Sequence, residues 1–369
     1  MQTAATGRRP EEDAAGRPGD ERPRGGSRAE WAVRAVLVAA QAATVLMTWR
    51  VWEPRTHPPM LPLVHLPDVH AGWPMLASLA VALPWPRIGV PLHTAVLAVA
   101  IVADQSRMQP HLLSLATLLW GTTGWAGGRI VARAGLGALW CYAGIHKATS
   151  PPYYTTSGAW MLRAVCPGGP AWLGPVVAAA VAGTEIFLGV GCFVPRIRRA
   201  AAVAAVPFHL ATFSVLAFRL GWDAPVWPWN LALAVAGPAF LMQWRGPGLG
   251  GSYASAGVAA RVAAVTLLVL PLGYWLGVVD AFLAHCVYAD NRPRAYVCTP
   301  FSRTELDQLC QRLGVALPPA HRHYAPLFRG IGRPGEWLEI EDPRWVARWF
   351  GFSRRTISWQ DVADPADTP

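Results

Sequence analysis

The sequence predicts an all-α integral membrane helical bundle of about nine spans, with a small α/β appendage at its C-terminal end. Hydrophobic residues make up 53% of the 369-residue chain and charged residues only 15%. Ordinary soluble domains carry roughly 25% charged residues. The apolar residues also come in long blocks, which is typical of membrane-spanning helices. This composition excludes a disordered protein, a collagen and a typical cytosolic enzyme.

Changes of composition divide the chain into four segments. Residues 1–28 are polar and rich in Gly, Pro and charge, so we expect a disordered cytoplasmic tail. Residues 29–279 hold the apolar blocks, and 280–360 predict a small extracytoplasmic α/β domain before a disordered tail at 361–369. The expected spans are about 30–50, 71–86, 88–104, 110–128, 129–147, 171–195, 200–220, 224–244 and 257–279.

Two of these blocks, 71–86 and 88–104, are short for a span of about 20 residues. They are separated only by a proline-rich corner. A single re-entrant unit is therefore an open alternative to two spans.

The arginine distribution predicts the orientation of the bundle. The chain carries a net charge of +10, and its basic residues lie at the ends of apolar blocks and in the tails. This distribution indicates that they orient the protein in the membrane rather than bind nucleic acid. The cluster Arg196–Arg199 is the strongest marker of a cytoplasmic loop. We therefore expect a multi-pass protein of the cell membrane. With nine spans, its N-terminus lies in the cytoplasm and its C-terminal domain on the extracytoplasmic side.

Four elements are expected in the C-terminal domain. Residues 294–297 (RAYV) and 336–340 (EWLEI) are typical of strands, and 342–351 (DPRWVARWFG) of a short helix. Residues 302–305 have capping-box spacing and predict a helix that runs to about Arg312.

No metal or nucleotide site is predicted. The six cysteines have no CxxC and no zinc-site spacing, and no phosphate-binding glycine loop occurs. If the C-terminal domain is extracytoplasmic, two of Cys286, Cys298 and Cys310 could pair, but the sequence does not choose the pair.

Ionisable residues inside membrane spans are candidates for function, because burying them is unfavourable. Lys147 is the single lysine among 32 Lys and Arg residues, and it follows His146 at the outer end of the fifth span. A desolvated lysine amine can lose its proton, whereas arginine cannot. The structural alternative is that Lys147 reaches the interface and His146 caps the helix.

Glu185 and His209 lie mid-span on consecutive helices, at comparable depth from the arginine turn between them. A carboxylate at that depth must be protonated or paired. A Glu185–His209 pair, or a contact between Glu185 and Lys147, is expected, either as a functional site or as a buried clip between helices. Asp104 and Arg107 are expected to form a local ion pair at the outer interface.

The stretch Cys141–Leu162, with its basic pair followed by a short polar loop with tyrosines, resembles an element of the HTTM family. This family comprises the vitamin K-dependent γ-glutamyl carboxylase and its bacterial relatives. Residues 183–199 and the following span with His209 are similar to the same family and to DoxX-like membrane proteins. Residues 104–110 and 285–297 resemble uncharacterised bacterial membrane proteins of this kind.

The resemblance implies that Lys147, the second residue of the basic pair, is the base that deprotonates a quinol. His146 stands where the carboxylase has another lysine, and a small appendage replaces its large extracytoplasmic domain. The expected function is quinone-linked oxidation or carboxylation in the bilayer, with Lys147 and His146 at the catalytic site and Glu185 and His209 as charge partners. The alternative is a non-enzymatic membrane scaffold or a DoxX-like redox partner subunit.

Overall fold

The computed structural model describes residues 28–64, 66–67, 70–243, 253–254, 256–310 and 313–362. The two expected disordered tails fall outside these ranges, apart from three residues. Arg28 begins the first helix, and Asp361 and Val362 end the last one.

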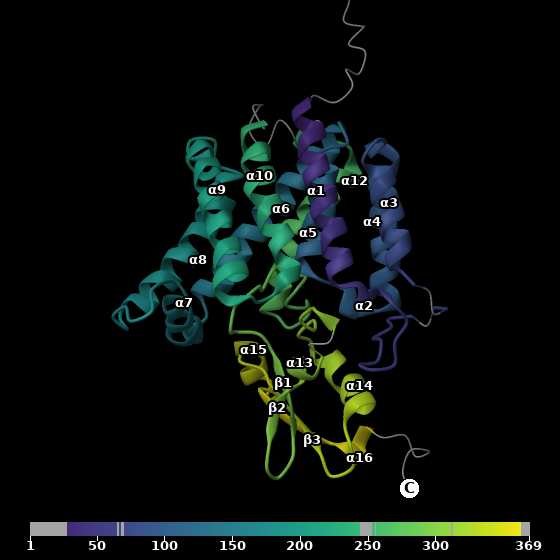
Figure 1. Cartoon of the computed structure of the whole chain (residues 1–369), viewed down its shortest axis with the longest axis vertical. Helices are drawn as coiled ribbons and strands as arrows, with labels where there is room; N and C mark the ends of the chain where they lie inside the picture. Colours follow the sequence, from purple (N-terminus) through teal and green to yellow (C-terminus); the bar gives the residue numbers. More distant parts are fainter. Residues whose placement is uncertain are drawn as a thin grey trace, which may run out of the picture.

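The described residues are mostly helical (66%), with a small sheet near the C-terminal end. Figure 1 shows an upper layer of helices and a lower layer that contains the sheet. The longer helices of the bundle are α1 (Arg28–Met47), α3 (Gly72–Ala82), α4 (Pro86–Ala103), α5 (Pro110–Trp120), α6 (Ala126–Ala148), α7 (Gly158–Val165), α8 (Leu173–Gly191), α9 (Arg198–Ser214), α10 (Trp227–Gln243) and α12 (Val258–Val269). Shorter pieces are α2 (Trp49–Trp52), η1 (Gln105–Arg107), η2 (Tyr153–Ser157), η3 (Val215–Leu220), η4 (Ala224–Val226) and η5 (Leu270–Tyr274).

The expected count of about nine spans is not supported. Among the described residues, four helices are long and apolar enough to cross a membrane: Arg28–Met47, Pro86–Ala103, Leu173–Gly191 and Arg198–Leu220. Helices α3 and α5 have 11 residues each. At 1.5 Å per residue each is about 17 Å long, well short of a hydrocarbon core of about 30 Å. Apolar composition alone overestimated these two elements.

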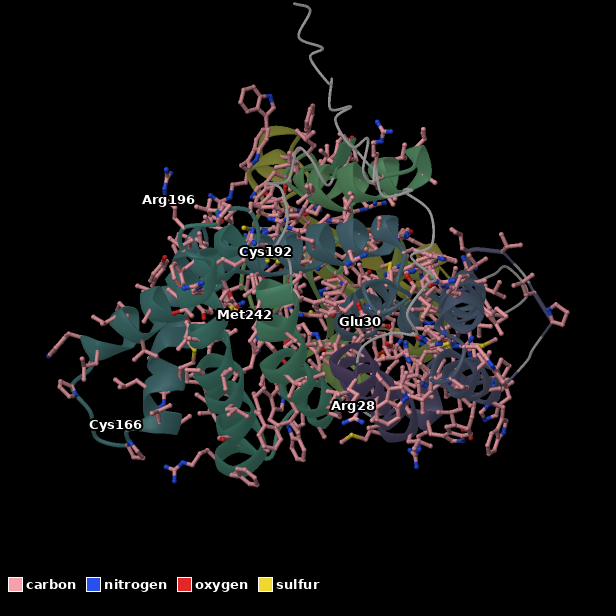
Figure 2. All side chains as sticks on the ribbon, turned by 90° about the horizontal axis from the view of Figure 1, so that it is seen from above. Arg28, Glu30, Cys166, Cys192, Arg196 and Met242 are labelled. Carbon is pink, nitrogen blue, oxygen red and sulfur yellow. The ribbon has the colours of Figure 1, made fainter. Side chains whose placement is uncertain are left out.

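The ends of the helices form two opposite faces of the bundle. Arg34 of α1 donates to the carbonyl of Thr122, and Arg133 of α6 donates to that of Cys192 at the end of α8. The beginnings of α1 and α6 and the α8–α9 turn therefore lie at the same end of the bundle. Figure 2 looks onto this face and shows Arg196 at its rim, with Cys192 and Met242 nearer the middle. The sheet lies at the other end of the bundle (Figure 1).

The C-terminal domain is built on a four-stranded antiparallel sheet of order β2-β1-β3-β4. Its strands and helices are β1 (Arg294–Cys298), β2 (Arg303–Glu305), α13 (Leu306–Leu309), α14 (His321–Ile331), β3 (Trp337–Glu341), α15 (Trp345–Trp349), β4 (Arg354–Ser358) and α16 (Trp359–Val362). Strands β1 and β3 and helix α15 confirm three of the four expected elements.

The helix expected from Ser302 to about Arg312 is wrong in its first half. Residues Arg303–Glu305 form β2, which pairs with β1 from Tyr296 to Cys298. Ser302 closes the turn before it, where its backbone N–H donates to Thr299 Oγ1 at 2.9 Å. Strand pairing satisfies these backbone groups and overrides the capping pattern. The helix that follows, α13, has only four residues, and 311–312 lie outside the described part of the chain.

The C-terminal domain shares a core with the end of the bundle that it covers. Val45, Trp52 and Leu97 of the bundle belong to the same buried cluster as Val297 and Phe328. Polar contacts reinforce this junction, because the side chain of Gln105 accepts from Arg322 Nε at 3.0 Å and contacts His323 Nε2 at 3.1 Å. The appendage therefore lies against the bundle.

Candidate functional site

The site is built where α6 and α8 touch backbone to backbone. A Cβ atom on Gly144 of α6 would lie 2.7 Å from the carbonyl oxygen of Ala182 and 2.8 Å from the backbone nitrogen of Ile186. A Cβ atom on Gly189 of α8 would lie 2.6 Å from the backbone nitrogen of Cys141. Only glycine permits such an approach without a shift of the helices. These two glycines bring the last turn of α6 against the middle of α8.

Lys147 and Glu185 meet at this contact. Lys147 Nζ donates to Glu185 Oε1 at 2.9 Å and to Oε2 at 2.8 Å, so the amine faces both carboxylate oxygens. The third donor is directed at the carbonyl of Ala143, at 3.5 Å. The side chains are 4% and 13% exposed. Of the alternatives left open by the sequence, the structure places Glu185 with Lys147.

His146 lies on the neighbouring face of α6, against aromatic rings. Its imidazole stacks on Trp275 with ring centroids 4.5 Å apart and meets Tyr274 edge-on at 4.8 Å. Nε2 is 3.0 Å from the carbonyl oxygen of Ala284, so this nitrogen carries the proton and donates. Nδ1 is buried and has no hydrogen-bond partner among the residues that the structure describes. His146 thus presents a free acceptor one residue before Lys147.

His209 does not join this site. Its Nε2 accepts from Trp140 Nε1 at 3.1 Å, and its Nδ1 lies 3.0 Å from Asn230 Oδ1. The two contacts define a neutral imidazole that donates to Asn230 and accepts from Trp140. The expected contact with Glu185 is therefore wrong. Helix α9 packs far more against α10 than against α8, which turns His209 toward Asn230.

Removing this imidazole is expected to destabilise the bundle without touching the α6–α8 site. His209→Ala leaves Trp140 Nε1 and Asn230 Oδ1 buried and unpartnered, at a cost of about 1–3 kcal/mol for each group. We expect a clearly lower unfolding midpoint in detergent. His57→Ala is the control, because the side chain of His57 is exposed and its hydrogen bond is to the neighbouring Thr56. Equal midpoints for the two variants would contradict the assignment of His209 as a clip.

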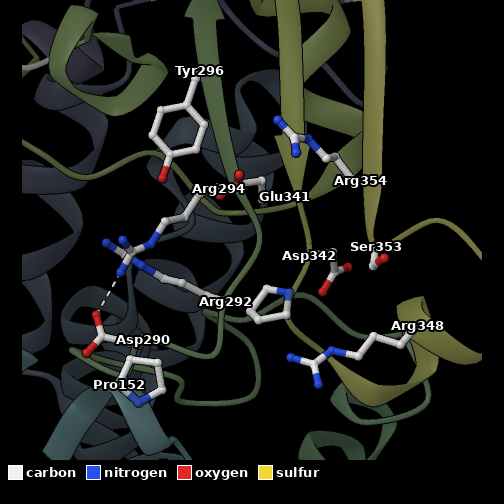
Figure 3. Close-up of a pocket in the computed structure, with 11 residues that line it drawn as sticks. Pro152, Asp290, Arg292, Arg294, Tyr296, Glu341, Asp342, Arg348, Ser353 and Arg354 are labelled. Carbon is white, nitrogen blue, oxygen red and sulfur yellow. Dashed lines mark hydrogen bonds and ion pairs between the residues drawn. The ribbon is translucent and has the colours of Figure 1, made fainter. Parts of the chain in front are cut away.

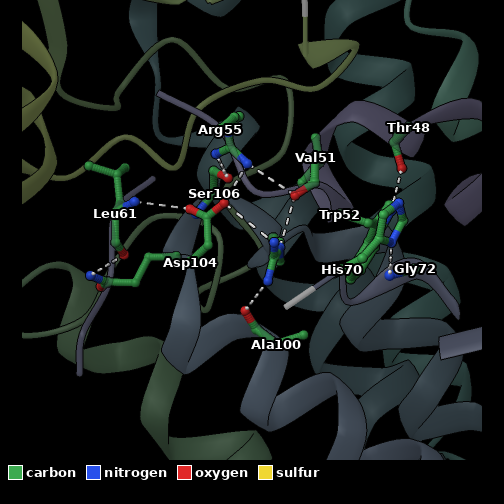
Figure 4. Close-up of polar contacts among 12 residues, drawn as sticks. Thr48, Val51, Trp52, Arg55, Leu61, His70, Gly72, Ala100, Asp104 and Ser106 are labelled. Carbon is green, nitrogen blue, oxygen red and sulfur yellow. Dashed lines mark hydrogen bonds and ion pairs between the residues drawn. The ribbon is translucent and has the colours of Figure 1, made fainter. Parts of the chain in front are cut away.

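Asp104 and Arg107 lie in a buried polar cluster where the chain passes from α4 to α5. The expected Asp104–Arg107 ion pair is present, with Asp104 Oδ2 3.7 Å from Arg107 Nε, but Arg55 Nη1 lies nearer to the same oxygen, at 2.6 Å. Asp104 Oδ1 accepts from the backbone N–H of Leu61 and of Ser106, both at 3.1 Å. Figure 4 shows Asp104 between Leu61 and Arg55. The cluster fixes the loop before α3, and its contacts are structural.

Several residues of these sites were not singled out by the sequence. Trp275 contacts His146, Arg55 contacts Asp104, and Asn230 contacts His209. In each pair the two residues lie far apart along the chain. The presence of polar or aromatic side chains at helix ends was the only available signal. The partner of each follows from how the helices pack.

The cysteines and possible metal ligands form no further centre. All six cysteines are free thiols, and Cys286, Cys298 and Cys310 are each buried without a disulfide. Among the residues that the structure describes, no group of three or more His, Cys, Asp or Glu side chains is arranged to hold a metal ion.

Comparison with family models, with curated proteins and with solved structures found no match to this chain.

Proposed function

We propose that the chain is a polytopic membrane protein whose Lys147–Glu185 pair exchanges a proton with a lipid-soluble quinol. The four long apolar helices support the membrane placement. Exposed tryptophans at both ends of the bundle support it further, since Trp is enriched at the two membrane–water interfaces. They are Trp31, Trp85 and Trp125 at the α8–α9 turn end, and Trp73, Trp160, Trp172 and Trp222 at the opposite end.

The Arg196–Arg199 turn lies in the cytoplasm and the C-terminal domain outside, because basic loops are retained on the cytoplasmic side. Reporter fusions placed after Arg199 and after the C-terminal residue are expected to give signals from opposite sides of the membrane. A fusion within the exposed Gly168–Gly169 turn is expected to match the C-terminal one. Signals from one side for both main fusions would contradict this orientation.

The observation that carries the proposed chemistry is a buried amine held by a single carboxylate. Both side chains are largely buried, and burial disfavours the charged forms, so the ion pair and the neutral amine–acid pair approach each other in free energy. When the ammonium proton passes to Glu185, the amine of Lys147 becomes a free base. It then takes the hydroxyl proton of the quinol, which leaves a quinolate anion, an ammonium and a carboxylic acid.

The lipid-facing side of α8 offers a way in for such a quinol. Gly183, one residue before Thr184 and two before Glu185, is exposed, and a Cβ atom there would meet nothing within 4 Å. Glu185 keeps 13% of its side chain exposed on the same helix. The resemblance of Cys141–Leu162 to the HTTM element supports the same assignment of Lys147 as the base, with His146 beside it.

The test separates binding of the quinol from loss of its proton. Lys147→Arg keeps the positive charge but cannot act as a base. In nanodiscs, we expect the variant to retain bound quinone, measured by solvent extraction, while the absorbance of the quinolate seen with the native protein disappears. Arg163→Lys, an exposed change on α7, is the control and is expected to behave as the native protein. An unchanged quinolate signal in Lys147→Arg would end the proposal.

A non-enzymatic membrane scaffold, or a DoxX-like redox partner subunit, is the second candidate. The imidazole of His209 favours it, because both of its ring nitrogens are used in hydrogen bonds that join α9 to α6 and α10. If the Lys147–Glu185 pair is a clip of the same kind, no quinone is retained by the purified protein, and Lys147→Arg changes stability alone.

A further inference from the structure

A cavity of about 350 Å³ lies between the sheet and the loop that follows α6. Its wall carries four arginines, and Tyr296 and Ser353 add hydroxyl groups. Figure 3 shows Arg292 and Arg294 on one side of this arginine cavity and Arg348 on the other. Helix α6 leads into the arginine cavity through η2, because Pro152, just before η2, lines the cavity and Ser157 Oγ of η2 donates to Asp290 Oδ2 at 2.7 Å.

Each carboxylate of the arginine cavity already has a basic partner. Asp290 binds Arg294 at 2.7 Å, and Glu341 binds Arg303 at 2.6 Å. Asp342 is bound by Arg344 and by His321 at 2.6 and 2.8 Å. Burial acts to raise the pKa of Asp342, but the hydrogen bonds from His321 and Arg344 outweigh it and lower the pKa to about 2.

Two of the four arginines of the arginine cavity have no carboxylate partner among the described residues. Arg354 pairs with Glu339. The guanidinium groups of Arg292 and Arg348 form no ion pair and donate no hydrogen bond to any residue that the structure describes. Two guanidiniums that line one cavity and form no ion pair with the described residues, with hydroxyl groups beside them, match the oxygen atoms of a phosphate group, which arginine binds through paired N–H donors.

An exposed apolar surface adjoins Arg348 on α15. Trp345, Trp349 and Phe350 are 48%, 78% and 70% exposed. Helix α15 sits at the outer end of α12, because Arg344 Nη1 donates to the carbonyl of Tyr274 at 3.4 Å. Leu276 and Val278, just beyond Tyr274, are exposed as well. An apolar surface of this kind next to the end of a membrane helix is suited to the interface with lipid.

We propose that the arginine cavity binds the phosphate group of an anionic phospholipid, whose acyl chains lie along the apolar surface of α15 and the 276–278 loop. The proposal rests on the membrane placement given above and is independent of the proton chemistry. Arg292 and Arg348 hold the phosphodiester oxygens, and the exposed aromatic side chains of α15 hold the lipid at the interface. A soluble phosphate would use the arginines but gain nothing from these aromatic side chains.

The test counts lipids retained by the purified full-length protein. The protein is reconstituted with phosphatidylglycerol or phosphatidylcholine, and retained lipid is measured by native mass spectrometry. In Arg292→Gln/Arg348→Gln, each lost cation removes about 1 kcal/mol of attraction, so we expect about thirtyfold weaker retention of phosphatidylglycerol. Arg333→Gln/Arg355→Gln removes the same charge from exposed positions outside the lining of the cavity and is expected to retain the lipid as the native protein does.

A second variant identifies the source of the phosphate group. Trp349→Ser is expected to weaken retention of phosphatidylglycerol but to leave titration with inorganic phosphate unchanged. If the Arg292→Gln/Arg348→Gln variant kept its size-exclusion profile and retained as much phosphatidylglycerol as the native protein, the assignment of the arginine cavity as the binding site would be wrong. Equal affinity for inorganic phosphate and for the lipid would overturn the lipid as its ligand. No quinol is present in these measurements, so their outcome does not depend on Lys147.

Discussion

Asp104→Ala is expected to lower stability by about 3–5 kcal/mol, the range seen when one partner of a buried charge cluster is removed. Asp104 is fully buried, and Arg55 and Arg107 are 8% and 1% exposed. Without the carboxylate, two guanidiniums stay buried with no counter-charge, and the N–H groups of Leu61 and Ser106 lose their acceptor. The measurement is the unfolding midpoint in detergent, followed by the circular dichroism of the helices.

Two further variants separate the charge of Asp104 from its hydrogen bonds. Asp104→Asn keeps an acceptor for Leu61 and Ser106 but removes the charge, so we expect an intermediate loss. Glu53→Ala removes a carboxylate that lies 3.8 Å from His70 and is 42% exposed, and we expect a loss of less than about 1 kcal/mol. If Asp104→Ala were as mild as Glu53→Ala, the cluster would not hold the α4–α5 junction.

Breaking the Lys147–Glu185 pair is expected to be the second large effect. Lys147→Met leaves a buried carboxylate, and Glu185→Leu leaves a buried ammonium, so each single change is expected to destabilise by about 3–5 kcal/mol. The double variant replaces both charges by apolar side chains and is expected to lose much less than the sum. The comparison of unfolding midpoints across the four proteins measures the coupling.

Glu185 and His209 provide a control pair for this comparison of single and double variants. They belong to separate sets of contacts, at Lys147 and at Trp140 with Asn230. We therefore expect the losses from Glu185→Leu and His209→Ala to add. Strong coupling between these two residues, and none between Lys147 and Glu185, would contradict the arrangement of α6, α8 and α9.

The sequence predicts the long apolar helices well but misjudges some of the shorter elements. Helices α1, α6 and α8 begin and end within a few residues of their expected positions because unbroken apolar runs determine them. The blocks at α3 and α5 are equally apolar, yet their helices end after 11 residues. Residues 303–305 show the other failure, since pairing with β1, a distant segment, decides their conformation.

The sequence likewise predicts one part of the candidate site and not the other. The depth of Glu185 and His209 can be counted along the helices, but the rotation of each helix about its axis cannot. That rotation depends on packing, here on Gly144 and Gly189, which bring α6 against α8 and place Lys147 at Glu185. Asp104 shows a related limit, because a local partner three residues away competes with Arg55, which reaches it from another loop.

Infrared difference spectroscopy on the reconstituted protein tests the proton transfer most directly. When quinol is added to the protein in nanodiscs, the proposed reaction converts the carboxylate of Glu185 to a carboxylic acid. We expect a new carboxylic-acid C=O band that shifts in heavy water and is absent from Glu185→Gln and from Lys147→Arg. A spectrum with no such band, or one with the same band in Glu185→Gln, would contradict a proton-transfer role for the Lys147–Glu185 pair.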